Sequence, residues 1–480
     1  MLKETTKKIA IVLAVLTIAL IFAPFGQAKA EEELPLKYIF LFIGDGMGYS
    51  QINLAQMMEG NEKKGETAIR ELSFSKFPYT GIVNTHDKTS LIPDSASTAS
   101  AMSTGNKIYS GVICKDTDLM KSFKTIAQQY KEAGRKVGIL SSVTLNHATP
   151  AAFYASVDSR KEYYEIGKQM ADSNFDYFAG GSLGQRTGKD GKSKDLYQIL
   201  KDKGYKITET RKDFENIKKG EKVYAVSERL QDSGAMPYMV DQKKGDMTLH
   251  EMVKKGIEVL DNEKGFFMMA EGGKIDWACH ANDARAAYGD VLDLELAVNE
   301  AIKFYNKHPK ETLILVTADH ETGGMSLGYY LTHYNTNLEI LRGQKISQVE
   351  FDNKITALGE KVKFEQVKKI ITENTALKFN GKEDDKFVLN EREINLIKQS
   401  IEAYNKGEKV EKDDEYTLKY GGYNPIAITI TKLIANKSGI TFGTNDHTAV
   451  PIPVYAIGKH AELFTGTFHD TKIHEKMLAK

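Results

Sequence analysis

The sequence predicts an α/β protein in which helices cover a parallel or mixed β-sheet. Short apolar runs alternate with longer stretches whose apolar residues recur at helical spacing. Several of these runs are followed directly by acidic residues or histidine, as at the ligand-binding edge of an open sheet. The chain has 480 residues, of which 41% are apolar and 27% charged, so it can bury a large core.

Five apolar runs are the expected strands: Tyr38–Ile43, Lys136–Leu140, Phe266–Ala270, Leu313–Thr317 and Pro453–Ile457. The residues that follow the first four are Asp45, His147, Glu271, and Asp319 with His320. Ligands in open α/β sheets bind outside the carboxyl ends of the strands. We therefore expect these side chains to form one polar site at one edge of the sheet.

The N-terminal segment has the pattern of a signal peptide. Lys3, Lys7 and Lys8 precede an apolar run from Ile9 to Phe25, and the small-residue pattern Ala28-Lys29-Ala30 follows. Residues 1–30 are thus expected to direct export, leaving residues 31–480 extracellular, periplasmic or at the cell surface. A retained membrane anchor stays open as an alternative, because the apolar run is long for a cleaved signal. A membrane is an expected partner only in that case.

Net charge and cysteine content argue against a nucleic-acid-binding protein and against a domain held together by disulfides. Lysine plus arginine equals aspartate plus glutamate, at 65 each, so bulk charge gives no reason to expect binding to nucleic acid. Cys114 and Cys279 are too few to hold an exported domain together with disulfides. Two separate thiols are favoured, and a single disulfide between them stays open.

The composition changes between about residues 329 and 423, where lysine and glutamate are frequent. Apolar residues recur there at helical spacing, as in Ile355-Leu358-Val362. We expect a mostly helical insertion within the catalytic domain. The sequence does not indicate the function of this insertion.

Ser95 lies in a run of small residues that ends at Gly105. The run predicts a tightly packed helix with Asp94 or Ser95 near its N-terminus and the glycine as C-cap. Taken alone, the serine is better explained as a helix cap. The alternative is a nucleophile, since backbone N–H groups and the helix dipole at this position favour negative charge.

Other motifs supply candidate metal ligands. Asp45 occupies a glycine-rich turn, Gly44–Gly48, directly after a predicted strand. Asp276 and His280 are four residues apart and would share one face of a helical turn. Such oxygen and nitrogen donors suit zinc. Glu271, Asp319, His320 and His447 are further candidates.

These motifs together resemble the alkaline phosphatase family, over about residues 38–328 and again over 443–458. The matching motifs are Gly44-Asp45-Gly46-Met47-Gly48, Asp94-Ser95-Ala96, His147-Ala148-Thr149, Ser159-Arg160, Glu271 with Asp276 and His280, Thr317-Ala318-Asp319-His320, and Asp446-His447-Thr448. The resemblance implies a three-layer α/β/α sandwich around a large, mostly parallel mixed sheet.

The resemblance also implies roles for individual residues. Asp276, His280 and His447 would hold one zinc ion, and Asp45, Asp319 and His320 a second that also binds the Ser95 oxygen. Asp45, Thr149 and Glu271 would serve a third ion. Arg160 would bind the phosphoryl group through its guanidinium fork, oriented by Asp94.

Two positions depart from the best-known bacterial pattern, which has aspartate at His147 and lysine at Trp277. Both bear on the third ion and on phosphate binding. The third ion is expected to be Mg²⁺, or Zn²⁺ or Co²⁺ because imidazole suits these better.

The implied function is an exported, metal-dependent phosphomonoesterase with broad specificity and an alkaline optimum. It would hydrolyse small phosphate monoesters through a phosphoserine on Ser95. The family is commonly dimeric, so a homodimer is possible. Three alternatives stay open: a phosphodiesterase of the same superfamily, a non-catalytic metal- or phosphate-binding protein, and a surface protein that binds partners through the 329–423 segment.

Overall fold

The computed structural model describes residues 36–61, 67–382, 384–407 and 413–479. The predicted signal peptide lies outside these residues. No helix among the described residues has both the length and the apolar character needed to cross a membrane.

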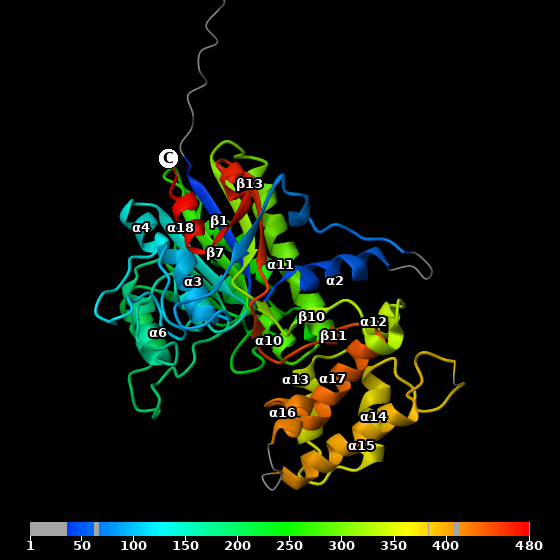
Figure 1. Cartoon of the computed structure of the whole chain (residues 1–480). Coiled ribbons are helices and arrows are strands. Elements are labelled where there is room, and N and C mark those ends of the chain that lie inside the picture. Colours follow the sequence, from blue (N-terminus) through cyan, green and yellow to red (C-terminus); the bar gives the residue numbers. More distant parts are fainter. Residues whose placement is uncertain (1–35, 62–66, 383, 408–412, 480) are drawn as a thin grey trace, which may run out of the picture. The chain divides into compact units, whose positions relative to one another are not determined.

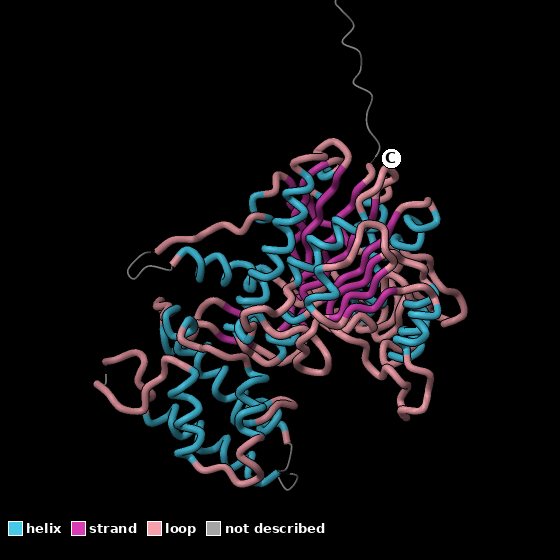
Figure 2. The backbone as a smooth tube through the Cα atoms, turned by 180° about the vertical axis from the view of Figure 1, so that it is seen from behind, coloured by secondary structure: helices cyan, strands magenta, loops and turns pink. Residues whose placement is uncertain are grey.

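A ten-stranded sheet forms the centre of the fold (Figures 1 and 2). Its strand order is β14-β2-β13-β8-β1-β7-β3-β4-β6-β5. The five predicted strands are confirmed as β1 (Tyr38–Gly44), β3 (Lys136–Ser141), β7 (Phe266–Gly272), β8 (Thr312–Ala318) and β13 (Ile452–Gly458). Of the ten, only β13 runs antiparallel to its neighbours. The expected mostly parallel mixed sheet is therefore confirmed.

Five strands that were not expected extend the sheet: β2 (Tyr79–Asn84), β4 (Tyr177–Gly180), β5 (Lys206–Thr208), β6 (Val223–Val226) and β14 (Gly466–His469). They have three to six residues each. Strands this short give little periodic signal in a sequence.

Helices cover both faces of the sheet, as expected for a sandwich. Figure 1 shows α3 (Ser95–Thr104), α4 (Ile126–Glu132) and α18 (Thr471–Met477) on one side of the strands. On the other side lie α2 (Tyr49–Gly60) and α11 (Ala284–Tyr305), the latter packed against α9 (Leu249–Leu260). The core between the layers consists of aliphatic and aromatic side chains that are almost entirely buried.

The central strands end in register. Gly44 of β1 pairs with Gly272 of β7 and with Ala318 of β8. Residues just beyond these positions must therefore meet at the same edge of the sheet. A short pairing of β9 (Glu321–Thr322) with β12 (His447–Thr448) brings a distant segment to the same edge.

The described residues between 329 and 423 are mostly helical. They form α12 (Leu338–Arg342), α13 (Gln348–Thr356), α14 (Phe364–Asn374), α15 (Glu391–Lys406) and α16 (Asp414–Tyr420). α17 (Pro425–Lys437) follows and packs against α12, α13, α15 and α16. That this segment is an insertion in the catalytic domain stays a prediction.

Candidate active site

Three sets of acidic and histidine side chains meet at this edge of the sheet. They are Asp276 with His280 and His447, Asp45 with Asp319 and His320, and Asp45 with His147 and Glu271. Within each set the potential ligand atoms lie within 4.8 Å of one another. Asp45 belongs to two sets, so the three form one continuous site.

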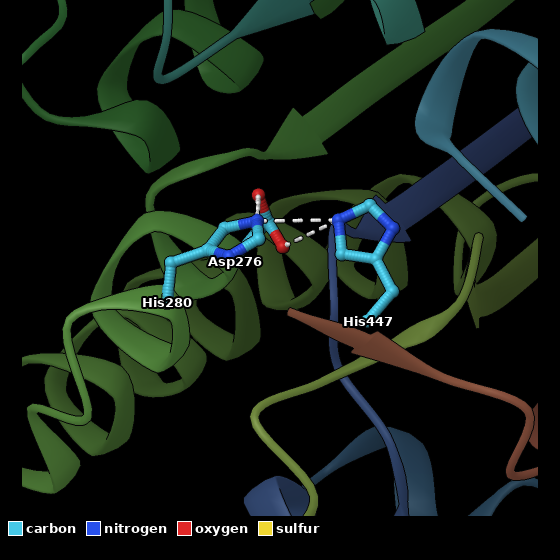
Figure 3. Close-up of side chains that lie close together, drawn as sticks. All are labelled: Asp276, His280 and His447. Carbon is cyan, nitrogen blue, oxygen red and sulfur yellow. Dashed lines mark hydrogen bonds and ion pairs between the residues drawn. The ribbon is translucent and has the colours of Figure 1, made fainter. Parts of the chain in front are cut away.

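The first set combines a short helix with the segment at β12 (Figure 3). Asp276 and His280 lie one turn apart on α10 (Lys274–His280), and His280 Nε2 is 3.3 Å from Asp276 Oδ2. His447 Nε2 lies 3.2 Å from His280 Nε2 and 3.6 Å from Asp276 Oδ1. Three donor atoms thus converge on one point.

Backbone carbonyls orient both histidines of this set. His280 Nδ1 is 2.5 Å from the carbonyl oxygen of Asn445, and His447 Nδ1 is 2.8 Å from that of Pro93. A carbonyl accepts only, so each Nδ1 carries the proton when the ring is neutral. Each Nε2 then presents a lone pair to the cluster, as a metal ligand requires.

The second set lies at the ends of β1 and β8. His320 Nε2 is 3.4 Å from Asp45 Oδ1 and 3.2 Å from Asp319 Oδ2. All three side chains are fully buried. The turn after β1 permits this close approach through Gly46, whose φ is +69° and whose missing Cβ would lie 2.7 Å from Thr322 Oγ1.

Ser95 is the first residue of α3 and is buried beside the second set, with its Oγ 3.1 Å from His320 Nε2. Asp94 is the N-cap of this helix and accepts a hydrogen bond from Ser97 N, while Gly105 ends it at φ +74°. The predicted capped helix is confirmed. The interpretation of Ser95 itself as the cap is wrong, because Asp94 is the cap, and the Ser95 hydroxyl faces the cluster instead.

Arg160 contacts both Asp94 and His147. Its Nη1 donates to Asp94 Oδ2 over 2.9 Å, and its Nη2 is 3.3 Å from His147 Nε2. Burial opposes ionisation of Asp94, but the Arg160 charge and two backbone N–H groups outweigh it and lower its pKa. The pair is therefore ionic at neutral pH.

The third set surrounds Asp45 from the other side. Thr149 Oγ1 donates to Asp45 Oδ2 over 3.4 Å, and Ser141 donates to Glu271. Trp277 is half-buried and stands edge-on to His147, with ring centroids 5.9 Å apart. Burial, together with the Arg160 charge, lowers the pKa of His147 to about 3, so its imidazole is neutral.

The chemistry of these donors fits bound cations. Four buried atoms of the second and third sets have no hydrogen-bond partner within the described chain: Asp45 Oδ1, Asp319 Oδ2, Glu271 Oε1 and His147 Nδ1. Burial raises the pKa of Asp45, as do neighbouring carboxylates, and burial raises that of Glu271 to about 7. Concentrated, unsatisfied negative charge of this kind is expected where a metal ion completes the site.

Sequence reasoning missed two residues of this region. Thr322 Oγ1 donates to Asp276 Oδ1 over 2.5 Å and lies 3.2 Å from His320 Nδ1, so it links the first two sets. Lys274 is fully buried, with Nζ 3.6 Å from the ring centroid of Tyr238 and 4.9 Å from that of Trp277. Their positions in the sequence were the one available indication that they lie near the site: Thr322 is two residues after the candidate ligand His320, and Lys274 is two residues before the candidate ligand Asp276.

Cys114 and Cys279 are both buried free thiols, so the favoured interpretation of two separate cysteines is confirmed.

Structural metal sites are closed and isolated, whereas these donor sets adjoin one another and border a buried serine and an arginine. The arrangement is that of a metal-dependent hydrolase, in which bound cations activate an oxygen nucleophile.

Comparison with known proteins narrows this class. The family model for alkaline phosphatase matches residues 36–480. Alkaline phosphatase 3 of Bacillus subtilis is 30% identical over 457 residues, covering 93% of this chain and 89% of that protein. The crystal structure of the cold-active alkaline phosphatase of a psychrophilic Shewanella has a TM-score of 0.73 at 26% identity, covering 92% of this chain and all of that one.

The alkaline phosphatase of Thermus thermophilus gives a TM-score of 0.75 at 25% identity, with 95% of this chain and 94% of that one covered. The chain therefore belongs to the alkaline phosphatase family. Its members are metal-dependent phosphomonoesterases, and the predicted three-layer fold is confirmed.

Proposed function

We propose that this chain hydrolyses small phosphate monoesters to an alcohol and inorganic phosphate through a phosphoserine on Ser95. The observation that carries the proposal is the position of the Ser95 hydroxyl, at a helix N-terminus and 3.1 Å from His320 Nε2 in a cluster of potential metal ligands. A serine used only as a cap would have no reason to face such a cluster.

Each of the protein residues has its own role in the reaction. Arg160 binds two phosphoryl oxygens through its fork and neutralises their charge, and Asp94 holds that fork in place. Ser95 attacks phosphorus in line with the leaving oxygen. The alcohol leaves on the side of Asp276, His280 and His447, opposite the attacking serine. Water then hydrolyses the phosphoserine and regenerates the hydroxyl.

Divalent ions, when bound, would supply the Lewis acidity that lowers the pKa of the serine hydroxyl and of water, and would stabilise the attacking and leaving oxygens. We propose zinc for Asp276, His280 and His447 and for Asp45, Asp319 and His320, since both sets mix carboxylate and imidazole. For the third set, with Asp45, His147, Thr149 and Glu271, we propose Zn²⁺ or Co²⁺ ahead of Mg²⁺.

A relative supports the choice of Zn²⁺ or Co²⁺ over Mg²⁺ for the third set. Variants of the Antarctic TAB5 alkaline phosphatase, in which one histidine is replaced by aspartate or glutamate, hold Mg in their M3 site. A carboxylate in place of imidazole suits Mg²⁺, which prefers oxygen ligands. His147 of this chain offers nitrogen instead.

We also propose that residues 1–30 direct export, that residues 31–480 form the catalytic domain and that the helical segment at 329–423 is an insertion in it. Trp277 and His147 border the phosphate position, since His147 contacts Arg160. Broad specificity follows from recognition that concentrates on the phosphoryl group.

Reconstitution tests the proposed activity. Metal-free protein should regain hydrolysis of 4-nitrophenyl phosphate on addition of zinc, and should hydrolyse bis(4-nitrophenyl) phosphate far more slowly. Ser95→Ala should abolish turnover while zinc still binds. A faster diester reaction would favour a phosphodiesterase, and zinc binding with no hydrolysis of either ester would favour a non-catalytic binding protein.

A further inference from the structure

A cavity of about 470 Å³ borders the proposed site on the side of the leaving group. His280 forms part of its wall, together with Asn445 and Asp446 from the loop that precedes His447. Tyr423 lines it as well. Burial raises the pKa of Tyr423, and the charge of Asp276 raises it further, so this wall lies within electrostatic reach of the first ligand set.

The helical segment also contributes to the wall of the cavity. Thr417, Leu418, Gly421 and Gly422, at the end of α16 and just beyond it, line the cavity. The two glycines carry no side chain into this space. The segment between 329 and 423 therefore helps to enclose a space that adjoins a candidate metal ligand.

Lys432 of α17 is the only lysine among the described residues that line this cavity. Its Nζ donates to the backbone carbonyl of Lys419 over 3.0 Å. In the part of the chain that the structure describes, no carboxylate forms an ion pair with it. Lys437, one and a half turns along the same helix, contrasts with it because its Nζ lies 3.1 Å from Glu393 Oε2.

A half-buried ammonium without an acidic partner carries an electrostatic cost. Burial lowers the pKa of Lys432, and no carboxylate among the described residues offsets that effect. Three ammonium hydrogens and one carbonyl acceptor also leave donors unused. An anion in the cavity would use them and offset the cost.

Among the described residues that line the cavity, Asp446 is the one acidic residue. Its side chain is exposed, so water screens its charge, whereas Lys432 is half-buried. Of these two charges in the cavity wall, that of Lys432 is therefore screened less by water.

We propose that this cavity receives the alcohol part of the monoester and that Lys432 binds an anionic group, a carboxylate or a second phosphate, carried by that alcohol. The inference rests on the proposed function, because it needs the alcohol to leave beside His280. Within the broad specificity proposed above, it favours monoesters of acidic alcohols and gives the helical segment a part in substrate choice.

Two series of non-hydrolysable phosphonates test this without relying on turnover. ω-Carboxyalkylphosphonates of three to six carbons are compared with alkylphosphonates of equal length, by calorimetry on the zinc-loaded enzyme. At one chain length the carboxylate should tighten binding about 10- to 100-fold, as expected for a charge-assisted hydrogen bond. The Lys432→Met variant should lose this gain and bind the alkylphosphonates as the parent does.

Lys419→Met is the matched control, because it removes one lysine from the neighbouring helix, where Lys419 Nζ pairs with the exposed Glu415. It should keep the full gain. If the carboxylate adds no affinity at any length in the parent, or if the gain survives in Lys432→Met, the anion subsite is wrong while the proposed function stands. If the zinc-loaded parent does not hydrolyse 4-nitrophenyl phosphate, the proposed function fails and the subsite with it.

Discussion

The double substitution His147→Asp and Trp277→Lys should tighten the binding of inorganic phosphate. His147 Nε2 lies 3.3 Å from Arg160 Nη2, and Trp277 stands edge-on to the same imidazole. A lysine at position 277 would place an ammonium near the phosphate position. An aspartate at position 147 would offer a carboxylate to Arg160, to that ammonium and to the third ion.

The magnitude follows from opposing charges. One new cation about 5 Å from phosphate contributes roughly 3 kcal/mol at an effective dielectric constant of about 20. The negative charge of the new aspartate opposes part of this. A net gain of about 1–2 kcal/mol remains, which is roughly a tenfold lower inhibition constant for phosphate.

Competitive inhibition by phosphate should be measured for the parent, both single variants and the double variant, each loaded with zinc and then with magnesium. We expect the double variant to bind phosphate about tenfold more tightly, to release product more slowly and to gain more from magnesium than the parent. Equal or weaker phosphate binding in the double variant would refute the roles assigned to His147 and Trp277.

Three further predictions follow from the same structure. Trp277 is the only tryptophan, so its fluorescence should change when a chelator removes the metals; an unchanged spectrum after complete zinc loss would place it away from the site. Asp94→Asn keeps the helix cap but removes the charge that faces Arg160, so kcat/KM should fall about 10- to 100-fold; a loss below threefold would contradict the pairing. Burial raises the pKa of the Asp470 carboxyl to about 6, although the charge of Lys107 offsets part of this shift. The folded state therefore holds the carboxyl proton more tightly than the unfolded state does. The free energy of unfolding should fall by about 3 kcal/mol as pH rises from about 4 to 6. Urea unfolding of metal-free protein should show this loss of stability in the parent and not in Asp470→Asn. If the stability of both proteins changes with pH in the same way, the role assigned to Asp470 is wrong.

The central strands could be predicted because they are buried on both faces and form continuous apolar runs. In β1, β7 and β8 every residue is buried. β2 escaped prediction because exposed and buried residues mix along it, and β5 because it has only three residues. The edge of a sheet is thus harder to predict than its centre.

The candidate site could be predicted as far as its residues follow strands or share a helical turn. The positions of Asp45 and Asp319 follow from the aligned ends of β1 and β8. The approach of His447 depends on its pairing with Thr322 across the β9–β12 ladder, which no local spacing encodes. For the same reason the place of Lys432 in the cavity wall emerges only from the three-dimensional arrangement.

The identity of the nucleophile is the central claim, and trapping the intermediate tests it most directly. Zinc-loaded enzyme is mixed with excess monoester, quenched in acid within milliseconds and digested for mass spectrometry. We predict one phosphate on Ser95 in the parent and none in Ser95→Ala. Phosphate on another residue, or steady turnover by Ser95→Ala, would contradict the account.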